Sequence, residues 1–159
     1  MNDFVSTPAQ PASPEGSAVT AGEWWPAIDV NRFRARYNLG TGSIPHARIE
    51  EALVHGLDSI TRQLGAWQLE AILLGFDALA DVAPEDVLND EPRLVHLFRR
   101  AVELTAAAEL ADNNLDLTAT DEGTDDAEAR RSLADRHRAR ATAAVRDIIG
   151  GTRCDVELV

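Results

Sequence analysis

Histidine and carboxylate side chains are the groups in this chain that could bind a metal or transfer protons. No two of the four histidines stand at the His-x-x-x-His spacing of a metal site. His55 has Glu51 before it and Asp58 after it, a spacing typical of charge pairs on a helix surface. Glu50 and Glu51 are adjacent and would point roughly 100° apart on a helix, so they cannot share one substrate. We therefore expect no enzyme.

Motifs for cations, phosphates and redox chemistry are also incomplete. The segment Asp112–Asp116 has oxygen ligands but lacks the glycine and the final glutamate of a calcium loop. The Gly40–Gly42 segment lacks the third glycine of a dinucleotide-binding loop. Cys154 is the only cysteine, which excludes an intramolecular disulfide. We expect no cofactor and no metal.

The charge balance argues against a nucleic-acid-binding protein. The chain has 159 residues, with 15 basic residues that are all arginine and 27 acidic ones, for a net charge of −12. The arginine-rich stretch 130–146 carries +5, and the stretch 121–128 before it carries −5. The two stretches cancel, and acidic residues before basic ones also suit the helix dipole. This pattern favours a salt-bridged helix or a subunit contact over DNA binding.

Membrane insertion and secretion are not indicated. No apolar run approaches the ~18–20 residues of a membrane-spanning helix. The segment Met1–Thr20 has neither the basic nor the apolar region of a signal peptide. We expect assembly in a reducing cytoplasm.

Residues 1–22 are rich in Ser, Thr, Pro, Ala and Gly, which predicts a flexible, disordered arm. Trp24 and Trp25 follow beside Pro26, and such a pair packs either at the edge of a core or on a partner protein. We interpret the pair as packing at the core edge or within a complex, and we keep both tryptophans as candidate partner-binding residues.

Residues 23–151 show helical spacing of apolar residues, which predicts an all-α fold, a small bundle of four to five helices. Caps and helix breakers set the boundaries. The predicted helices are 30–37 with Asp29 as N-cap, one or two helices over 45–80, a helix opening at Asp90-Glu91-Pro92 and ending near Asn113-Asn114, and a helix from Asp125 or Asp126 that is stopped by Gly150-Gly151.

The stretch from Pro45 to Ala80 repeats apolar residues every three or four positions. Gly65 and Gly75 leave open whether it forms one kinked helix or two shorter ones. Residues 81–89, with Pro84 inside, are predicted to form a turn. The side chains expected in the core are Leu53, Leu57, Phe76, Leu79 and Phe98.

The tail 152–159 alternates apolar and charged residues, which predicts a half-buried strand. No other segment of the chain is an obvious strand partner, so we expect the tail to add to a sheet edge of another protein. The candidate contact residues are Arg153, Cys154, Asp155, Val156, Glu157, Leu158 and Val159.

Several short stretches of the chain stand in a specific order and spacing. They are Asp29 with Arg32, Arg34 and Arg36, the helix around Arg48, Ala52 and Gly56, Gly75-Phe76, Leu79-Ala80-Asp81-Val82, Asp86, Arg100-Ala101-Val102, and the ending Arg153-Cys154-x-Val156. Together they resemble the phage head completion proteins (GPL) of contractile-tailed temperate phages, and the likeness covers roughly residues 24–159.

This resemblance implies a structural protein of the virion neck, assembled in the host cytoplasm. Such a protein adds to the portal vertex after genome packaging and forms a ring, a dodecamer matching the portal. The ring extends the DNA channel, with DNA only as passing cargo, and offers an attachment surface to a tail-side neck or tail completion protein. The sheet edge for the tail 152–159 would belong to the portal protein.

A helical DNA-binding regulator is the alternative function. It would need a compact helix-turn-helix with a basic face. The balanced charges of residues 121–146 argue against it.

Overall fold

The computed structural model describes residues 13–37, 44–116 and 124–150. Within this range it contains five α-helices, one short 3₁₀ helix and two small antiparallel strand pairs. The predicted all-α bundle is confirmed. The tail 152–159 lies outside the described residues.

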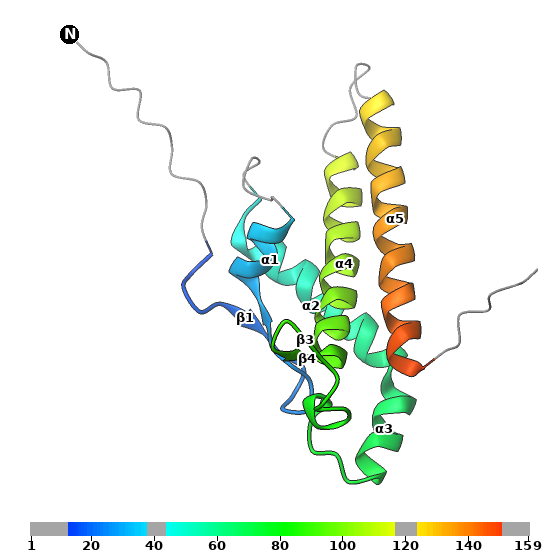
Figure 1. The fold of residues 1–159 in the computed structure, drawn as a ribbon. Coiled ribbons are helices and arrows are strands. Elements are labelled where there is room, and N and C mark those ends of the chain that lie inside the picture. Colours follow the sequence, from blue (N-terminus) through cyan, green and yellow to red (C-terminus); the bar gives the residue numbers. More distant parts are fainter. Residues whose placement is uncertain (1–12, 38–43, 117–123, 151–159) are drawn as a thin grey trace, which may run out of the picture.

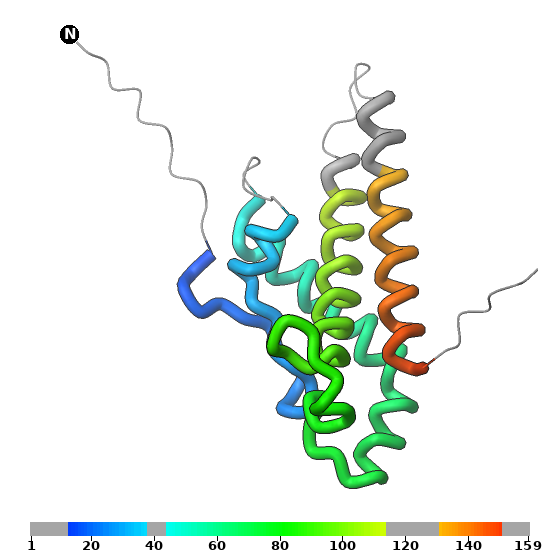
Figure 2. Tube along the Cα trace, in the orientation of Figure 1, coloured from blue at the N-terminus to red at the C-terminus, as the bar shows by residue number. Residues whose placement is uncertain are grey.

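Two long helices form the spine of the molecule, and the shorter elements pack against them (Figure 1). α4 packs along α5, and α2 crosses α4 on another side. The trace in Figure 2 shows α3 projecting from the end of the bundle where α5 finishes. The helices are α1 (Val30–Arg36), α2 (His46–Gln63), α3 (Gly65–Leu73), α4 (Arg93–Asp116) and α5 (Thr124–Ile149).

The first helix begins where its capping residue predicts. The Asp29 carboxylate accepts a hydrogen bond from the backbone N–H of Arg32 at 2.7 Å, so it satisfies one of the free donors at the start of α1. Val30 and Phe33 are buried on the inner side of this helix. The predicted N-cap is confirmed, and α1 ends at Arg36, just before Tyr37.

The stretch from 45 to 80 forms two helices, which answers the question that its sequence left open. α2 ends at Gln63, and Leu64 at the junction is fully buried. Leu64 N–H still donates to Ile60 O at 3.0 Å, and Gln68 N–H donates to Leu64 O at 2.8 Å. The junction therefore keeps its hydrogen bonds while the chain turns into α3.

The prediction that the helical pattern continues to Ala80 is wrong. α3 ends at Leu73, and Gly75 adopts a φ of 93°, a left-handed conformation that glycine tolerates because it has no Cβ. Phe76 therefore lies outside the helix and is only half-buried. Leu79 is fully buried as predicted, but in a 3₁₀ helix, η1 (Leu79–Asp81).

A tight hairpin lies where the next helix was predicted to open. β3 (Val87–Leu88) pairs with β4 (Glu91–Pro92), and Asn89 and Asp90 between them have φ values of 54° and 61°. Two consecutive residues with positive φ are typical of a type I′ turn, which suits the twist of a hairpin. α4 consequently begins at Arg93, and it runs past the predicted end to Asp116.

Small residues let the long helices approach one another closely. A Cβ on Gly56 of α2 would come within 2.8 Å of the Val102 carbonyl oxygen on α4. The buried alanines of α4 and α5 are Ala101, Ala106, Ala107, Ala108, Ala134, Ala141 and Ala144. α5 ends at Ile149, and Gly150 with a φ of 75° forms the predicted glycine stop. None of the described helices has the length and apolar content of a membrane span.

Part of the predicted arm packs on the bundle, which corrects the assignment of residues 13–22 to a disordered segment. β1 (Ala18–Val19) pairs antiparallel with β2 (Ile28–Asp29), and Val19 belongs to the core. Ser13 is also buried, and its hydroxyl accepts hydrogen bonds from the Arg34 guanidinium at 3.3 Å. Composition misled because local contacts hold the segment: the pairing of β1 with β2, the buried Val19 and the hydrogen bonds of Ser13. Residues 1–12 lie outside the described part.

Candidate functional site

The described histidines occupy separate environments. The ring Nδ1 of His46 lies 3.0 Å from the Ser13 hydroxyl, and His55 contacts Glu109 across α2 and α4. His137 lies elsewhere, beside Tyr37. No group of three or more His, Cys, Asp or Glu among the described residues could hold a metal ion. We find no converging acid–base site in this part of the chain.

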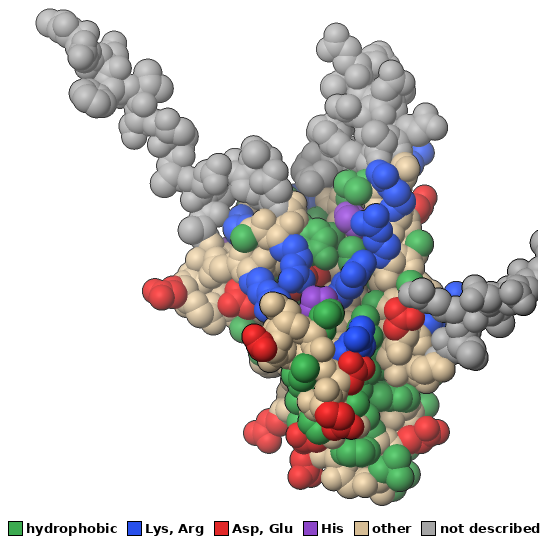
Figure 3. All heavy atoms as spheres, in the orientation of Figure 1, with side chains coloured by type: hydrophobic (Ala, Val, Ile, Leu, Met, Phe, Trp, Pro, Cys, Tyr) green, Lys and Arg blue, Asp and Glu red, His purple; other side chains and the backbone are tan. Residues whose placement is uncertain are grey.

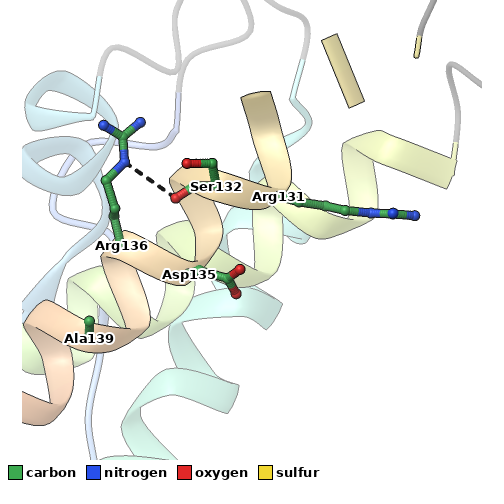
Figure 4. Close-up of a pocket in the computed structure, with 5 residues that line it drawn as sticks. All are labelled: Arg131, Ser132, Asp135, Arg136 and Ala139. Carbon is green, nitrogen blue, oxygen red and sulfur yellow. Dashed lines mark hydrogen bonds between the residues drawn. The ribbon is translucent and has the colours of Figure 1, made fainter. Parts of the chain in front are cut away.

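A shallow hollow on α5 does not supply a ligand site either (Figure 4). Its lining residues are Arg131, Ser132, Asp135, Arg136 and Ala139, all from this one helix. The guanidinium groups of Arg131 and Arg136 point away from each other, and Arg136 Nε donates to the Ser132 carbonyl oxygen at 3.3 Å. Polar groups that diverge in this way cannot enclose a small molecule.

Arginine side chains from three helices gather on one face of the molecule. In Figure 3 the basic groups follow α5 and face others over α1 and α4, with histidines between them. Arg136 and Arg140 are one turn apart on α5, so they share a helix face. We call this group the arginine surface; it consists of Arg36 of α1, Arg100 of α4, and Arg136 and Arg140 of α5, whose charges act on the neighbouring side chains of Tyr37 and His137.

A buried ion pair anchors one edge of the arginine surface. Glu103 of α4 is 1% exposed, and its carboxylate accepts a hydrogen bond from the Arg36 guanidinium at 2.6 Å. Burial, together with the charge of Glu103, raises the pKa of Tyr37 to about 12. The tyrosine hydroxyl is therefore neutral at pH 7. Among the described residues, Glu103 forms an ion pair with Arg36 alone.

The other arginines of this surface have no carboxylate partner among the residues that the structure describes. Arg100, Arg136 and Arg140 form no ion pair with any carboxylate among the described side chains. Burial lowers the pKa of His137, and the nearby charges of Arg140 and Arg136 lower it further. The imidazole is then neutral at pH 7, so the surplus positive charge belongs to the three guanidinium groups.

A second exposed feature is apolar and lies on α3. Leu69, Ile72 and Leu73 recur on one face of the helix, and Leu74 follows at its C-terminal end. Their exposed fractions are 59%, 47%, 78% and 77%. We call these four residues the leucine ridge. Contiguous exposed apolar side chains of this kind mark contact surfaces in soluble proteins.

The tryptophan pair packs within the molecule. Trp25 is 5% exposed and stacks on Phe98 of α4, with ring centroids 4.6 Å apart. Trp24 is half-buried against Trp67, and its indole N–H donates to the Phe76 carbonyl oxygen at 3.1 Å. The core-edge interpretation is therefore confirmed, and Trp25 is not available as a partner-binding residue. The candidate contacts 153–159 lie outside the described residues.

Sequence reasoning missed both exposed surfaces. Counting charges along residues 121–146 gave zero, but Arg136 and Arg140 share a face with arginines of two other helices. Their spacing of four residues on one helix was the available signal. The leucines of α3 show the spacing expected of a core face, so periodicity alone could not identify them as exposed.

Comparison with known proteins gives one consistent result. The family described as phage head completion protein (GPL) matches residues 19–159 of this chain. The chain is also similar to the head completion/stabilization protein of Escherichia phage P2, with 31% identity over 170 aligned positions that cover 100% of this chain and 99% of the relative. No solved structure matches it.

Proposed function

Because this chain belongs to the phage head completion protein (GPL) family, we propose that it is a structural virion protein that docks on the portal vertex of a DNA-filled head. There it forms a ring, a dodecamer on the portal, that extends the DNA channel. The ring presents the attachment surface for the tail or for the next neck protein. DNA passes through as cargo, and the protein resides in the neck of the virion.

The full-length likeness to a head completion/stabilization protein supports this role. The net charge of −12 supports a channel function, because an acidic wall repels the DNA backbone and lets it slide. The same charge keeps free copies apart, so we expect the ring to form on the portal and the free protein to be a monomer or a small oligomer.

The leucine ridge is the observation that carries the docking step. It protrudes from the bundle on α3, where Leu73 and Leu74 are more than three-quarters exposed. Each side chain of this kind contributes ~1–2 kcal/mol when a partner removes it from water. The entropy cost of association offsets much of what four such side chains contribute, so we expect one copy to bind weakly and a ring of copies to hold through many such contacts.

Binding to purified heads tests this proposal. The wild-type chain should bind DNA-filled heads that carry the portal and should not bind portal-free shells. Leu73→Ser with Leu74→Ser should reduce binding at least tenfold while circular dichroism stays unchanged. Val54→Ser is the matched control, because Val54 is an exposed apolar residue, 52% accessible, on α2 instead of α3. Equal binding to portal-free shells would contradict the proposal.

The tail 152–159 gives a second contact in this proposal, by adding as a strand to a sheet edge of the portal. Removing these residues should abolish portal binding and leave the helical content intact. Normal head completion by the truncated chain would refute this contact. A mobility-shift assay on duplex DNA addresses the alternative of a DNA-binding regulator, for which binding at physiological salt would be required.

A further inference from the structure

We propose that the arginine surface of one copy binds an acidic loop of a second copy, and that this contact joins neighbours in the ring. The acidic loop is residues 77–90, which connect α3 to α4 through η1 and β3. The inference rests on the proposed ring and names the surfaces that would form it.

The acidic loop has surplus carboxylates. Arg93 pairs with Asp86 at 2.9 Å, and Arg99 pairs with Glu91 just after the loop. Arg93 and Arg99, at the N-terminal end of α4, are therefore already engaged in ion pairs. Four carboxylates of the loop are exposed and form no ion pair within the described residues: Asp77, Asp81, Glu85 and Asp90.

The loop is held in place before any partner arrives. The backbone N–H of Leu79 donates to Trp24 O at 3.0 Å, and the N–H of Arg93 donates to Asp86 O at 2.7 Å. The hairpin of β3 and β4 fixes its last residues. A preorganised loop loses little conformational entropy on binding, so its carboxylates can form a specific contact.

The two charged surfaces do not neutralise each other within one copy. Figure 3 shows the basic groups over α1 and α5 and mainly acidic and apolar groups toward the α3 end. The arginine surface also keeps Arg100, Arg136 and Arg140 without carboxylates from the described part of the chain. Surplus charges of opposite sign on separate parts of one rigid molecule are complementary between copies. A contact between unlike surfaces is heterologous, and such contacts form a ring when the rotation from one copy to the next closes, as it would for copies held on a ring-shaped portal.

The acidic loop of a second copy offers this surface a defined set of partners. All the cations of the surface are guanidinium groups, whose planar donors fit carboxylates and phosphates alike in a forked geometry, and the loop supplies four exposed carboxylates that form no ion pair within the described residues. The net charge of −12 opposes the approach of a long polyanion such as DNA. It also opposes the association of free copies, so we expect the contact between copies to form once the portal holds them side by side. We therefore assign the surface to a protein neighbour, and DNA binding becomes an outcome of the test.

Paired charge reversals test the contact in the full chain. One variant carries Arg100→Glu and Arg140→Glu, and the other carries Asp81→Arg and Glu85→Arg. Each variant alone brings like charges together between copies, so filling the portal vertex of purified heads should require at least a tenfold higher concentration. An equimolar mixture should restore wild-type filling, because each contact then joins opposite charges again. Arg146→Glu and Glu51→Arg are matched controls on exposed residues outside both surfaces.

The mixture distinguishes a contact between copies from a contact with DNA or with the portal. Loss in the arginine variant without restoration in the mixture would overturn the proposal and would indicate a DNA or portal contact, which a mobility shift on duplex DNA then identifies. Unchanged filling by both variants would also overturn it. If the wild-type chain fails to bind heads, the proposed function fails. Sedimentation equilibrium of the same variants at high concentration and low salt still tests the contact between copies directly.

Discussion

α2 and α3 are consecutive helices separated by one residue, and they differ in what surrounds them. α2 buries Ile49, Leu53, Leu57 and Ile60 against the bundle, whereas α3 has one buried residue, Ala71. Yet α3 is the more apolar of the two. The folding of a single copy explains α2 but not α3, because nothing within the described part of the copy covers the leucines of α3. Apolar content that the fold leaves uncovered is best explained by binding, as with the leucine ridge.

The comparison is tested most strongly by the same substitution in both helices. Leu53 is fully buried, and Leu53→Ala should lower the free energy of unfolding by roughly 2–5 kcal/mol. Leu73 is 78% exposed, and Leu73→Ala should change it by less than ~0.5 kcal/mol. Urea denaturation measures both values. A large loss from Leu73→Ala would show that α3 stabilises the single copy, and the contrast would be lost.

Two glycines extend the contrast between α2 and α3 to the packing of the backbone. Gly56→Ala places a Cβ 2.8 Å from the Val102 carbonyl oxygen, and we expect a cost of about 1–3 kcal/mol because backbone cannot easily move aside. Gly65→Ala at the start of α3 meets nothing within 4 Å and should be neutral or slightly stabilising. Thermal unfolding of the two variants compares them directly. Equal destabilisation would place the start of α3 in a packed environment.

Truncation of the chain tests whether the segment 13–22 contributes to the stability of the fold. Deleting residues 1–22 removes the buried side chain of Val19 and the strand pair with Ile28–Asp29, so it should cost about 1–2 kcal/mol. A variant that lacks only residues 1–12 is the control and keeps both features. If both truncated chains have the same melting temperature, the segment 13–22 does not stabilise the fold and behaves as the predicted arm.

The smallest expected effect comes from the cap of α1. Asp29→Ala removes the acceptor for the Arg32 N–H and should cost about 1 kcal/mol. Asp29→Asn keeps an acceptor oxygen and should recover most of the loss. Chemical denaturation of the wild type and the two variants measures the free energy of unfolding. An equal loss of stability in Asp29→Asn would mean that the charge of Asp29 matters more than its hydrogen bond.

Local signals in the sequence predicted the parts of the fold that depend on neighbouring residues. Asp29 as a cap and Gly150 as a stop are set by backbone donors and conformations within one turn, so composition and order are sufficient. Leu53 and Phe98 were also placed correctly in the core. These predictions succeeded because the information lies within a few residues.

The remaining features depend on which segments meet in space. The spacing of Leu69 and Leu73 is the same whether a core or a partner covers them, so no pattern distinguishes the two cases. Likewise, the arginine surface exists because α1, α4 and α5 bring Arg36, Arg100 and Arg140 together around Tyr37. The hairpin at Asn89 and Asp90 was missed because the proline after it also suits a helix start.

The tryptophan pair also defines how mechanical force passes through the protein. Trp24 forms two hydrogen bonds with the segment that follows α3. Its indole N–H donates to Phe76 O, and its carbonyl oxygen accepts from the N–H of Leu79. Trp25, next in the chain, is stacked on Phe98 in the middle of the bundle. A pull on the leucine ridge therefore reaches the core by two routes, through the buried Leu64 into α2 and through Trp24 and Trp25 to Phe98 of α4. If the ridge is the docking contact, tension from the tail is shared between two helices of the bundle.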